Sequence, residues 1–350
     1  MIGLSLLTLV PGEIGGSETY VRGLTRGLAE VGLLDYLALV PPVAPGAGHG
    51  LPESVVTEYR PARTVPERMV AMAHAAARQR PLRRRFEGLD AVHYALTIQL
   101  PRLDLPSAVT IQDLQHLDLP QLFSRAERLF RRHAYESSVR RADAVIVPSQ
   151  FVRRGIVEHL GISPERVHAI PHGVDHDRFS PAGGPREGFI LYPARPWPHK
   201  NHERLFEAFA LLRRERPQLE LVLTGGGHDG RAVPEGVIVR GLVSLDELVS
   251  LYRRAACLVF PSLYEGFGYP PLEAMACGCP VAASGAGSLP EACGDAAALF
   301  DPRDAEDIAA VVAAVLESPE RFVAAGLERA ARFTWAETAR RHEAVYRLLL

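Results

Sequence analysis

Lysine and asparagine are almost missing from the sequence. Of the 39 lysine and arginine residues together, only Lys200 is a lysine, and Asn201, which follows it, is the only asparagine. Because arginine supplies the cation everywhere else, we infer that position 200 requires a compact, rotatable ammonium group. We expect Lys200 at a junction between a strand, a loop and a helix, where a point charge suits a phosphate. The sequence therefore singles out Lys200 as a candidate phosphate-binding residue.

Cysteines and long apolar runs are also scarce. The four cysteines fall in core-like segments, and their spacing fits no common zinc site; they are Cys257, Cys277, Cys279 and Cys293. We expect reduced, packed thiols, as in a cytoplasmic protein. No apolar run is long enough to span a bilayer. Residues 1–10 are apolar but short and lack a basic start, so they predict a first strand and no signal peptide.

Neither sign of charge dominates. The net charge of −2 at pH 7 gives no reason to expect a nucleic acid as a partner. A local basic cluster runs from Arg78 to Arg85 on an expected helix at residues 66–85. We favour a solvated basic face. The alternative is contact with anionic lipid headgroups, which would place the protein at the periphery of the inner face of a membrane.

The 350 residues are enough for two domains. Apolar runs typical of buried strands alternate with helical periodicity in both halves, which predicts an α/β protein with two doubly wound parallel sheets. A run rich in proline and glycine, residues 171–185, is the expected linker. We therefore expect a first domain at residues 1–180, a second at 181–334 and a final helix at 335–350.

Residues 261–284 predict a strand end, a loop, a short helix and another buried strand. Pro270 and Pro271 suit the first turn of the helix, where a missing N–H costs nothing. The start of that helix directs unpaired N–H groups and the positive end of its dipole at the loop 265–268, an arrangement that favours an anion such as phosphate.

Two carboxylates, Glu265 and Glu273, flank the start of this helix. A carboxylate does not favour a phosphate, so hydroxyl groups of a sugar or a ribose are the expected partners. One anion site beside two acceptors of hydroxyl groups suggests a nucleotide sugar. In the simpler alternative, Glu273 only complements the helix dipole and the glycines only turn the chain; the pattern by itself leaves both open.

Residues 265–281 follow the pattern E-G-F-G-x-P-x-L-E-A-M-A-x-G-x-P-V. This resembles the E-x7-E signature of the family 4 (GT4) retaining glycosyltransferases, and the resemblance extends over nearly the whole chain. It implies the GT-B fold, in which two Rossmann-like domains face each other across a cleft. It also implies transfer of a sugar from a nucleoside diphosphate to an acceptor hydroxyl with retention of anomeric configuration, and a final helix that crosses back to the first domain.

The resemblance also assigns roles in the donor site. An arginine and a Lys-Asn pair, here Arg195, Lys200 and Asn201, bind the donor diphosphate; Glu273 holds the ribose and Glu265 the transferred sugar. Two loops hold the base mostly through backbone groups. The expected donor-binding residues are Gly15, Gly16, Arg195, Lys200, Asn201, Thr224, Gly225, Leu242, Glu265, Gly266, Phe267, Gly268, Tyr269 and Glu273.

The expected first domain departs from the family at one position. The family often has His-Asp where this chain has Gln112 and Asp113, and that histidine contacts the transferred sugar. Glutamine forms hydrogen bonds but carries no proton charge. His116 is the candidate substitute, although we favour a surface histidine there. The expected catalytic residues are Arg195, Lys200, Glu265, Gln112 and His116.

The sequence predicts no metal site and no cofactor. Residues 175–177 spell D-x-D, the metal motif of the other large glycosyltransferase fold, but they lie in the expected linker, away from a strand end. The diphosphate is already met by Arg195, Lys200 and a helix start. No carboxylate of the first domain stands out as a nucleophile, so we expect front-face transfer assisted by the leaving phosphate.

The resulting prediction is a cytoplasmic retaining hexosyltransferase. Its partners would be a nucleotide sugar and a glycan, a lipid-linked or a small-molecule acceptor. A sugar phosphorylase or a nucleotide-sugar epimerase of the same fold remains open, and so does an inactive sugar-binding relative, which Gln112 suggests.

Overall fold

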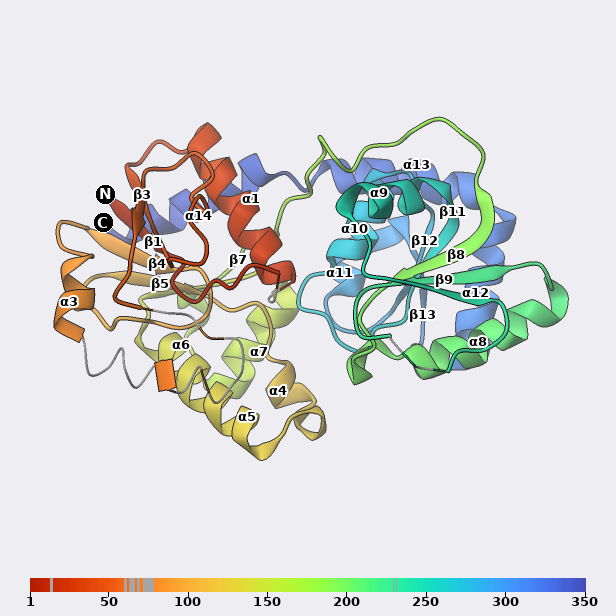
Figure 1. The fold of residues 1–350 in the computed structure, drawn as a ribbon, viewed down its shortest axis with the longest axis horizontal. Helices are drawn as coiled ribbons and strands as arrows, with labels where there is room; N and C mark the ends of the chain where they lie inside the picture. Colours follow the sequence, from red (N-terminus) through yellow and green to blue (C-terminus); the bar gives the residue numbers. More distant parts are fainter. Residues whose placement is uncertain are drawn as a thin grey trace. The chain divides into compact units, whose positions relative to one another are not determined.

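The computed structural model describes residues 1–12, 15–59, 62, 67, 70, 71, 79–228, 230 and 232–350. The chain forms two compact units (Figure 1). The first consists of Met1–Gly173 together with Trp335–Leu350, and the second of Val174–Thr334. Each unit is built on its own parallel sheet, so the prediction of two parallel-sheet α/β domains is confirmed.

The first unit has a seven-stranded sheet in the order β3-β2-β1-β4-β5-β6-β7, and every pair is parallel. The strand order reverses between β1 and β4, which marks the edge where open α/β sheets bind ligands. The strands are β1 (Ile2–Ser5), β2 (Tyr36–Val40), β3 (Glu53–Val55), β4 (Ala91–Tyr94), β5 (Ser107–Thr110), β6 (Ala144–Val147) and β7 (Val167–Ala169). The helices are α1 (Gly16–Val31), α3 (Gln79–Arg84), α4 (Gln115–Asp118), α5 (Arg125–Arg131), a π-helical turn (Arg132–Glu136), α6 (Ser137–Arg141), α7 (Gln150–Leu160) and α14 (Trp335–Leu349).

The second unit has a six-stranded parallel sheet in the order β10-β9-β8-β11-β12-β13. Its order reverses between β8 and β11. The strands are β8 (Glu187–Pro193), β9 (Glu220–Thr224), β10 (Val237–Gly241), β11 (Ala255–Phe260), β12 (Val281–Ser284) and β13 (Ala298–Phe300). The helices are α8 (His202–Glu215), α9 (Leu245–Arg254), α10 (Tyr269–Ala276), α11 (Leu289–Cys293), α12 (Ala305–Glu317) and α13 (Pro319–Ala331).

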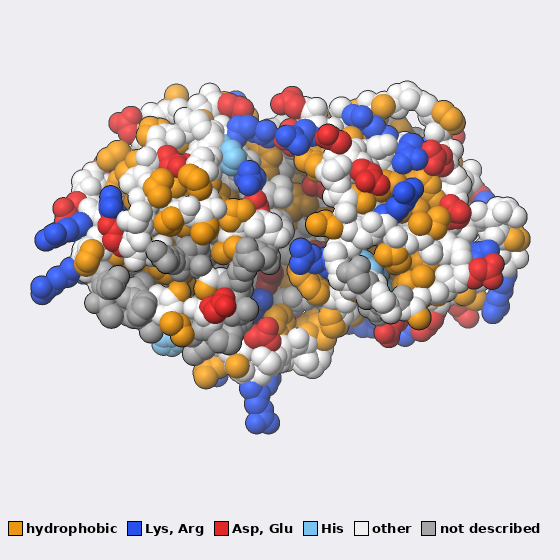
Figure 2. Space-filling model, in the orientation of Figure 1, with side chains coloured by type: hydrophobic (Ala, Val, Ile, Leu, Met, Phe, Trp, Pro, Cys, Tyr) orange, Lys and Arg blue, Asp and Glu red, His pale blue; other side chains and the backbone are white. Residues whose placement is uncertain are grey.

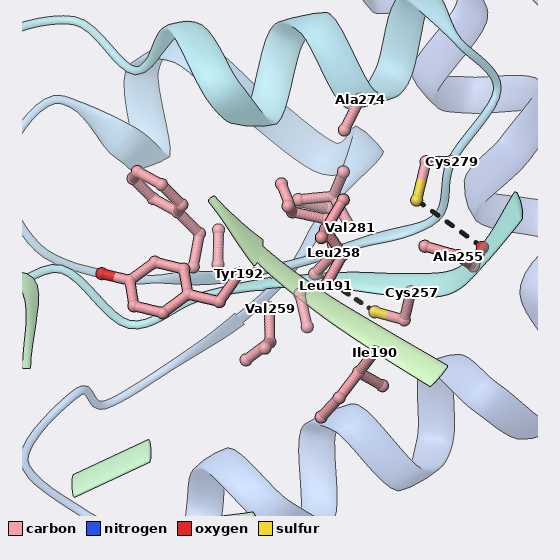
Figure 3. Packing of buried hydrophobic residues seen from close by; sticks show 14 of the residues in the cluster. Ile190, Leu191, Tyr192, Ala255, Cys257, Leu258, Val259, Ala274, Cys279 and Val281 are labelled. Atoms are coloured by element: carbon pink, nitrogen blue, oxygen red, sulfur yellow. Dashed lines mark hydrogen bonds between the residues drawn. The ribbon is translucent and has the colours of Figure 1, made fainter. Parts of the chain in front are cut away.

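The core of the second unit is apolar at its centre. Strands β8 and β11 lie side by side there, with side chains such as Leu191 and Leu258 fully buried (Figure 3). All four cysteines are free and buried, and Cys257 and Cys279 belong to this core. Burial raises the pKa of the Cys279 thiol to about 12, so it stays protonated and acts as a small apolar side chain.

The boundary between the units falls at Gly173 and Val174, before the expected boundary at residue 180. The Val174 N–H donates to Phe333 O at 3.0 Å, and the Phe179 ring packs in the core of the second unit, 6.2 Å from the Tyr252 ring. The proline- and glycine-rich composition correctly indicates a connection. It does not show that the last part of the connection packs on one side.

Helix α14 packs against α1 (Figure 1). Two glycines of α1 make room for it, because a Cβ atom at Gly23 would lie 2.0 Å from the Trp335 ring and one at Gly27 would lie 2.6 Å from Trp335 O. Farther along, the buried Glu343 carboxylate accepts hydrogen bonds from Leu33 N and from the Tyr36 hydroxyl, both at 2.6 Å. The residues from 335 onward thus complete the first unit.

A hydrogen-bonded network of buried side chains links α14 to the sheet. Tyr20 Oη lies 2.8 Å from both Thr110 Oγ1 and His342 Nε2. His93 lies 2.8 Å from Thr110 Oγ1 through Nε2 and 2.7 Å from the Tyr346 hydroxyl through Nδ1. Burial lowers the pKa of His342 to about 4 and that of His93 well below its usual range, so both rings are neutral at pH 7.

Candidate functional site

In the second unit, the candidate residues gather at the carboxyl edge of the sheet. Strands β10, β9, β8 and β11 are neighbours and parallel, so the loops after them meet at one edge. Every candidate residue of this unit except Tyr269 and Glu273, which belong to helix α10, lies at the end of one of these strands or in the loop that follows it. The candidate residues of this unit therefore lie along one edge of its sheet.

The loop after β8 carries Lys200 and Asn201. Residues Pro198–Lys200 form one 3₁₀ turn, and Asn201 follows in the left-handed conformation with φ of 61°. Asparagine tolerates this conformation better than most residues. The Asn201 side-chain amide donates to Pro302 O at 2.7 Å and to Pro261 O at 3.1 Å, so it fastens the loops after β13 and β11. Within this structure the only asparagine holds Lys200 in place.

Lys200 and Glu265 form an ion pair between the loops after β8 and β11. Their side chains are only 13% and 15% exposed. The Lys200 ammonium also lies 5.3 Å from the centre of the Phe260 ring, and the Tyr192 hydroxyl donates to Lys200 O at 2.5 Å. Because both charges are largely shielded from water, each affects the other more strongly than a surface pair would.

The N-terminus of α10 begins directly after this pair. Gly268 precedes the helix with φ of 116°, and a Cβ atom there would lie 3.0 Å from Leu289 Cδ2, so glycine is required on both counts. No side chain caps the helix. Ser288 fixes the preceding loop, since its hydroxyl donates to Phe267 O at 2.8 Å. The arrangement leaves the backbone N–H groups of Gly266–Tyr269 next to a lysine, which suits a phosphate.

Glu273 lies on α10 and faces α9. The Tyr252 hydroxyl donates to Glu273 Oε2 at 3.1 Å. Burial raises the pKa of this carboxyl to about 7, and the hydrogen bond from Tyr252 offsets only part of that shift. Glu273 therefore changes its charge near neutral pH, a property that its position in the E-x7-E pattern does not indicate.

Arg195, Gly225 and Leu242 border the same edge. The exposed Arg195 guanidinium lies 5.8 Å from the centre of the Trp197 ring, which is 51% exposed. Gly225 has φ of 112°, and a Cβ atom there would lie 3.0 Å from the Ala194 backbone, so the ends of β8 and β9 approach closely. Thr224, just before it, is buried, whereas Leu242 is 80% exposed. A flat ligand could lie on Leu242 or Trp197 without displacing any core side chain.

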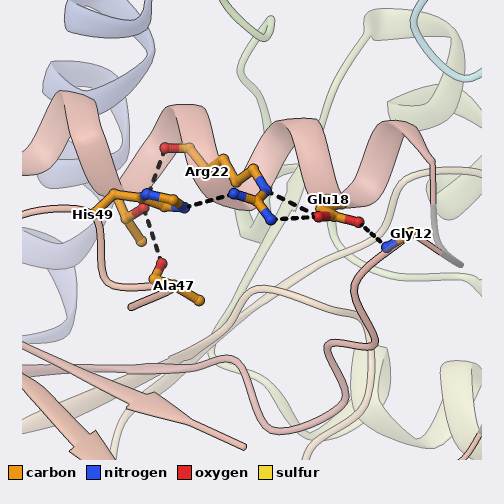
Figure 4. A network of polar contacts seen from close by, with 6 residues as sticks. Gly12, Glu18, Arg22, Ala47 and His49 are labelled. Atoms are coloured by element: carbon orange, nitrogen blue, oxygen red, sulfur yellow. Dashed lines mark hydrogen bonds and ion pairs between the residues drawn. The ribbon is translucent and has the colours of Figure 1, made fainter. Parts of the chain in front are cut away.

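In the first unit, Gly15 and Gly16 start α1 after β1. Gly15 has φ of 48° and caps α1 without a side chain, and a Cβ atom there would meet nothing within 4 Å. Glu18 holds this start, since its carboxylate accepts from Gly12 N at 2.7 Å and pairs with Arg22 at 2.7 Å (Figure 4). Gly15 and Gly16 are both exposed, and they supply backbone N–H groups at the carboxyl edge of the first sheet.

Gln112 follows β5, and its side-chain nitrogen is buried. No described residue accepts a hydrogen bond from Gln112 Nε2. A buried donor without an acceptor is unfavourable unless a water or a ligand supplies one. The Gln112 side-chain N–H can thus donate a hydrogen bond to a ligand, at the position where the family often has histidine.

The prediction of a surface histidine at position 116 is wrong. His116 is 3% exposed and lies on α4 with its ring edge-on to Tyr135, 5.8 Å between centres. Neither ring nitrogen has a hydrogen-bond partner among the described residues. Burial lowers its pKa to about 4, so the ring is neutral at pH 7. A single histidine in a four-residue helical turn has no periodicity that would have indicated this burial.

The basic cluster is only partly described. Arg78 lies outside the described residues. Arg85 pairs with Glu58 at 2.7 Å and Arg83 lies 3.8 Å from Asp104, so part of the cluster is neutralised. On the face in Figure 2, basic and acidic side chains are interspersed. None of the described helices combines the length and the apolar character that a membrane span needs.

The D-x-D sequence begins a turn. Asp175 O accepts from Phe179 N at 2.8 Å, and its carboxylate lies 3.8 Å from Arg178. The described part of the chain contains no cluster of three or more histidine, cysteine, aspartate or glutamate side chains arranged to hold a metal ion.

Comparison with known families gives two matches that overlap by a few residues. Residues 174–333 match the family described as glycosyl transferases group 1, and residues 14–178 match glycosyltransferase family 4. The chain is 30% identical over 285 residues to the O-antigen chain mannosyltransferase B of Escherichia coli, covering 74% of this chain and 75% of that protein. It is also 30% identical over 376 aligned positions to a D-inositol 3-phosphate glycosyltransferase of Geodermatophilus obscurus, covering 93% of this chain and 83% of the relative.

Solved structures share the fold at lower identity. The crystal structure of Anabaena Alr3699/HepE in complex with UDP-glucose superimposes with a TM-score of 0.72 at 18% identity, covering 100% of this chain and 99% of that chain. At this identity the likeness is one of fold.

Proposed function

We propose that this chain, which belongs to the GT4-type glycosyltransferases, transfers a hexose from a nucleoside-diphosphate sugar to an acceptor hydroxyl with retention of configuration. The observation that carries the proposal is the largely buried Lys200–Glu265 pair directly beside the N-terminus of α10, which no side chain caps. Together they supply a cation, the N-terminus of a helix that no side chain caps, and a carboxylate within one loop system. The HepE structure contains UDP-glucose, and the E. coli relative is a mannosyltransferase, which favours a hexose donor.

In this proposal the departing diphosphate is stabilised by Lys200, Arg195 and the N–H groups at the start of α10. Negative charge develops on the diphosphate as the sugar leaves, and donors already aimed at it lower the barrier. Glu265 would release part of its pairing with Lys200 and accept hydrogen bonds from the transferred sugar. Glu273 would accept from the ribose hydroxyls.

The acceptor attacks from the face of the leaving group in this proposal. The chain then needs no carboxylate nucleophile, since an oxygen of the departing phosphate takes the proton of the acceptor hydroxyl. We propose the same reaction without a divalent cation, because Arg195 and Lys200 meet the diphosphate. Gln112 would donate its unpaired N–H to the transferred sugar.

The second candidate is a sugar-binding relative without turnover, and Gln112 is the observation that favours it. A glutamine in place of the family histidine provides a hydrogen bond but no proton transfer. Under the front-face proposal no histidine is needed for proton transfer, so Gln112→His should leave turnover within a few-fold of wild type. A gain from no measurable activity to turnover in that variant would favour the inactive relative.

The test measures release of nucleoside diphosphate from a panel of nucleotide hexoses, with and without chelator. We expect release with one donor and an α-anomeric product from an α-anomeric donor by NMR. Lys200→Met should abolish release, whereas Arg214→Met, an exposed arginine of the adjoining helix α8, should not. Dependence on inorganic phosphate would indicate a phosphorylase, and inversion of configuration would refute the proposed mechanism.

A further inference from the structure

A pocket of about 570 Å³ lies in the first unit, and none of the candidate catalytic or donor-binding residues named above lines it. Its size is within the range of about 300–1,000 Å³ typical of small-molecule sites. One wall is the loop after β4, another is the continuous helical stretch of α5, the π-helical turn and α6, and Gln79 of α3 also lines the pocket. Six of its lining residues are Ile98, Leu100, Leu129, Phe130, Arg102 and Arg141. None of the described residues that line it is acidic.

Two polar residues of the inner wall, Ser138 and Gln99, form hydrogen bonds within the protein. Ser138 Oγ donates to Ala134 O at 2.7 Å and accepts from Gln99 N at 3.0 Å. The Gln99 side-chain amide donates to Ser107 Oγ at 3.2 Å. Because these groups are paired with one another, a polar occupant such as a peptide backbone would lose hydrogen bonds to water without replacing them. The inner wall therefore suits an apolar chain.

The rim is cationic. Arg102 and Arg141 both line the pocket, and neither pairs with a carboxylate among the described residues. Burial lowers the pKa of Arg102, and repulsion by the positive charge of Arg141 lowers it further. An anion between them would relieve this repulsion, and a guanidinium pair matches a phosphate in geometry as well as charge.

The wall has two further features that favour a ligand. Leu129 is 67% exposed at the mouth, which leaves a large apolar side chain in water. The π-helical turn Arg132–Glu136 interrupts the α-helix where His133 and Ala134 line the pocket, and such turns occur frequently at functional sites.

We propose that this pocket binds one lipid that carries a phosphate group, with the chain between the apolar walls and the phosphate at Arg102 and Arg141. A second copy of this chain fits less well, because the peptide backbone of an inserted segment would lose hydrogen bonds to water that the paired groups of the wall do not replace. The proposal concerns binding alone and does not depend on the proposed transfer reaction.

Titration calorimetry of the whole chain with three probes tests the source of the affinity. Dodecyl phosphate, used below its critical micelle concentration, carries the chain and the phosphate; inorganic phosphate carries only the anion, and dodecyl maltoside only the chain. We expect one dodecyl phosphate per chain, bound at least tenfold more tightly than either other probe. Equal binding of inorganic phosphate would reduce the site to an anion site, and equal binding of dodecyl maltoside would make it an apolar groove; each result overturns the proposal.

Variants locate the binding. Arg102→Gln and Arg141→Gln should each weaken the binding of dodecyl phosphate by about tenfold, the effect expected from the loss of one charged hydrogen bond. Arg132→Gln is the matched control, because Arg132 is exposed on the same helical stretch and does not line the pocket. Binding that survives in the Arg102→Gln, Arg141→Gln double variant lies elsewhere and contradicts the proposal.

Filling the pocket tests the apolar part separately. Ala126→Trp places a ring at the mouth from an exposed position and should abolish binding of dodecyl phosphate. If circular dichroism shows that Ala126→Trp misfolds, Leu129→Asn replaces it, because Leu129 is also exposed. This variant should weaken binding of dodecyl phosphate by several-fold. Unchanged affinity in a folded variant of either kind would place the chain outside this pocket.

Discussion

In the first unit the core between β4, β5, α1 and α14 contains a chain of hydrogen-bonded tyrosine, histidine and threonine side chains, whereas the core of the second unit around β8 and β11 is apolar. The network is stable only when each of its polar atoms lies within hydrogen-bonding distance of its partner, because a buried polar group that loses its partner lowers the free energy of unfolding. The apolar core tolerates changes that preserve volume. The difference teaches that the two parallel sheets, although alike in topology, should respond differently to truncation, pH and substitution.

Removal of residues 335–350 should produce the largest difference in stability between the two units. It uncovers the face of α1 at Gly23 and Gly27 and leaves Tyr20 and His93 without partners on α14. We expect peptides of the first unit to lose protection in hydrogen exchange while those of the second unit keep it. Equal loss in both units, or in neither, would contradict the independence of the two cores.

Acid should destabilise the first unit next most strongly. Its buried histidines have lowered pKa values, which include about 4 for His116 and for His342. Such a group is neutral in the folded state, so stability is complete above its unfolded pKa of about 6.5 and falls by up to roughly 1.4 kcal/mol per pH unit for each histidine below it. Denaturant unfolding at pH 7 and pH 5, followed by exchange mass spectrometry, should show the loss in the first unit. His342→Gln should reduce the slope.

Glu273 gives the second unit the opposite dependence. Its pKa is raised to about 7, so its contribution to stability is complete below pH 4.5 and is lost as the pH rises to 7. The loss amounts to about 3 kcal/mol at most, at roughly 1.4 kcal/mol per pH unit. Glu273→Gln should abolish this dependence of stability on pH. If Glu273 holds the ribose, the same variant should weaken binding of the nucleotide sugar at pH 8 by tenfold or more. An unchanged slope would show that another group titrates.

The smallest effects sharpen the comparison at single side chains. Tyr20→Phe removes one hydroxyl from the network of the first unit and should cost about 1–3 kcal/mol, because Thr110 and His342 lose a partner. Leu258→Met, the matched change in the apolar core, should cost less than about 1.5 kcal/mol. The free energies of unfolding of the two variants decide whether the network is the more sensitive core; a larger loss for Leu258→Met would reverse that order.

Much of the fold and of the site loops could be predicted from the sequence. Alternation of strand and helix indicated two parallel sheets, and the pattern at residues 265–281 correctly placed the start of α10 after β11. These are local signals, since each depends on residues within one turn or one strand. Membership of family 4, predicted from that pattern, is confirmed by the relatives.

The remaining features depend on contacts between distant residues. Tyr252 belongs to the apolar stripe of α9, and nothing in the stripe shows that its hydroxyl reaches Glu273. Tyr20 and His342 meet across 322 positions of sequence. The sequence marked Asn201 as unusual, but its bonds to Pro261 and Pro302 depend on how the loops after β11 and β13 fold. No pattern encodes such pairs.

Helix α14 also affects how the protein is made. During synthesis most of the first unit emerges before the second, yet the first unit lacks the partner of α1 until the residues after 334 emerge. The second unit is continuous in sequence and can fold before then, which reverses the usual order in which N-terminal domains fold first. Until those residues emerge, the face of α1 at Gly23 and Gly27 has no helix α14 to cover it. A chain that terminates before residue 335 leaves the same face uncovered permanently.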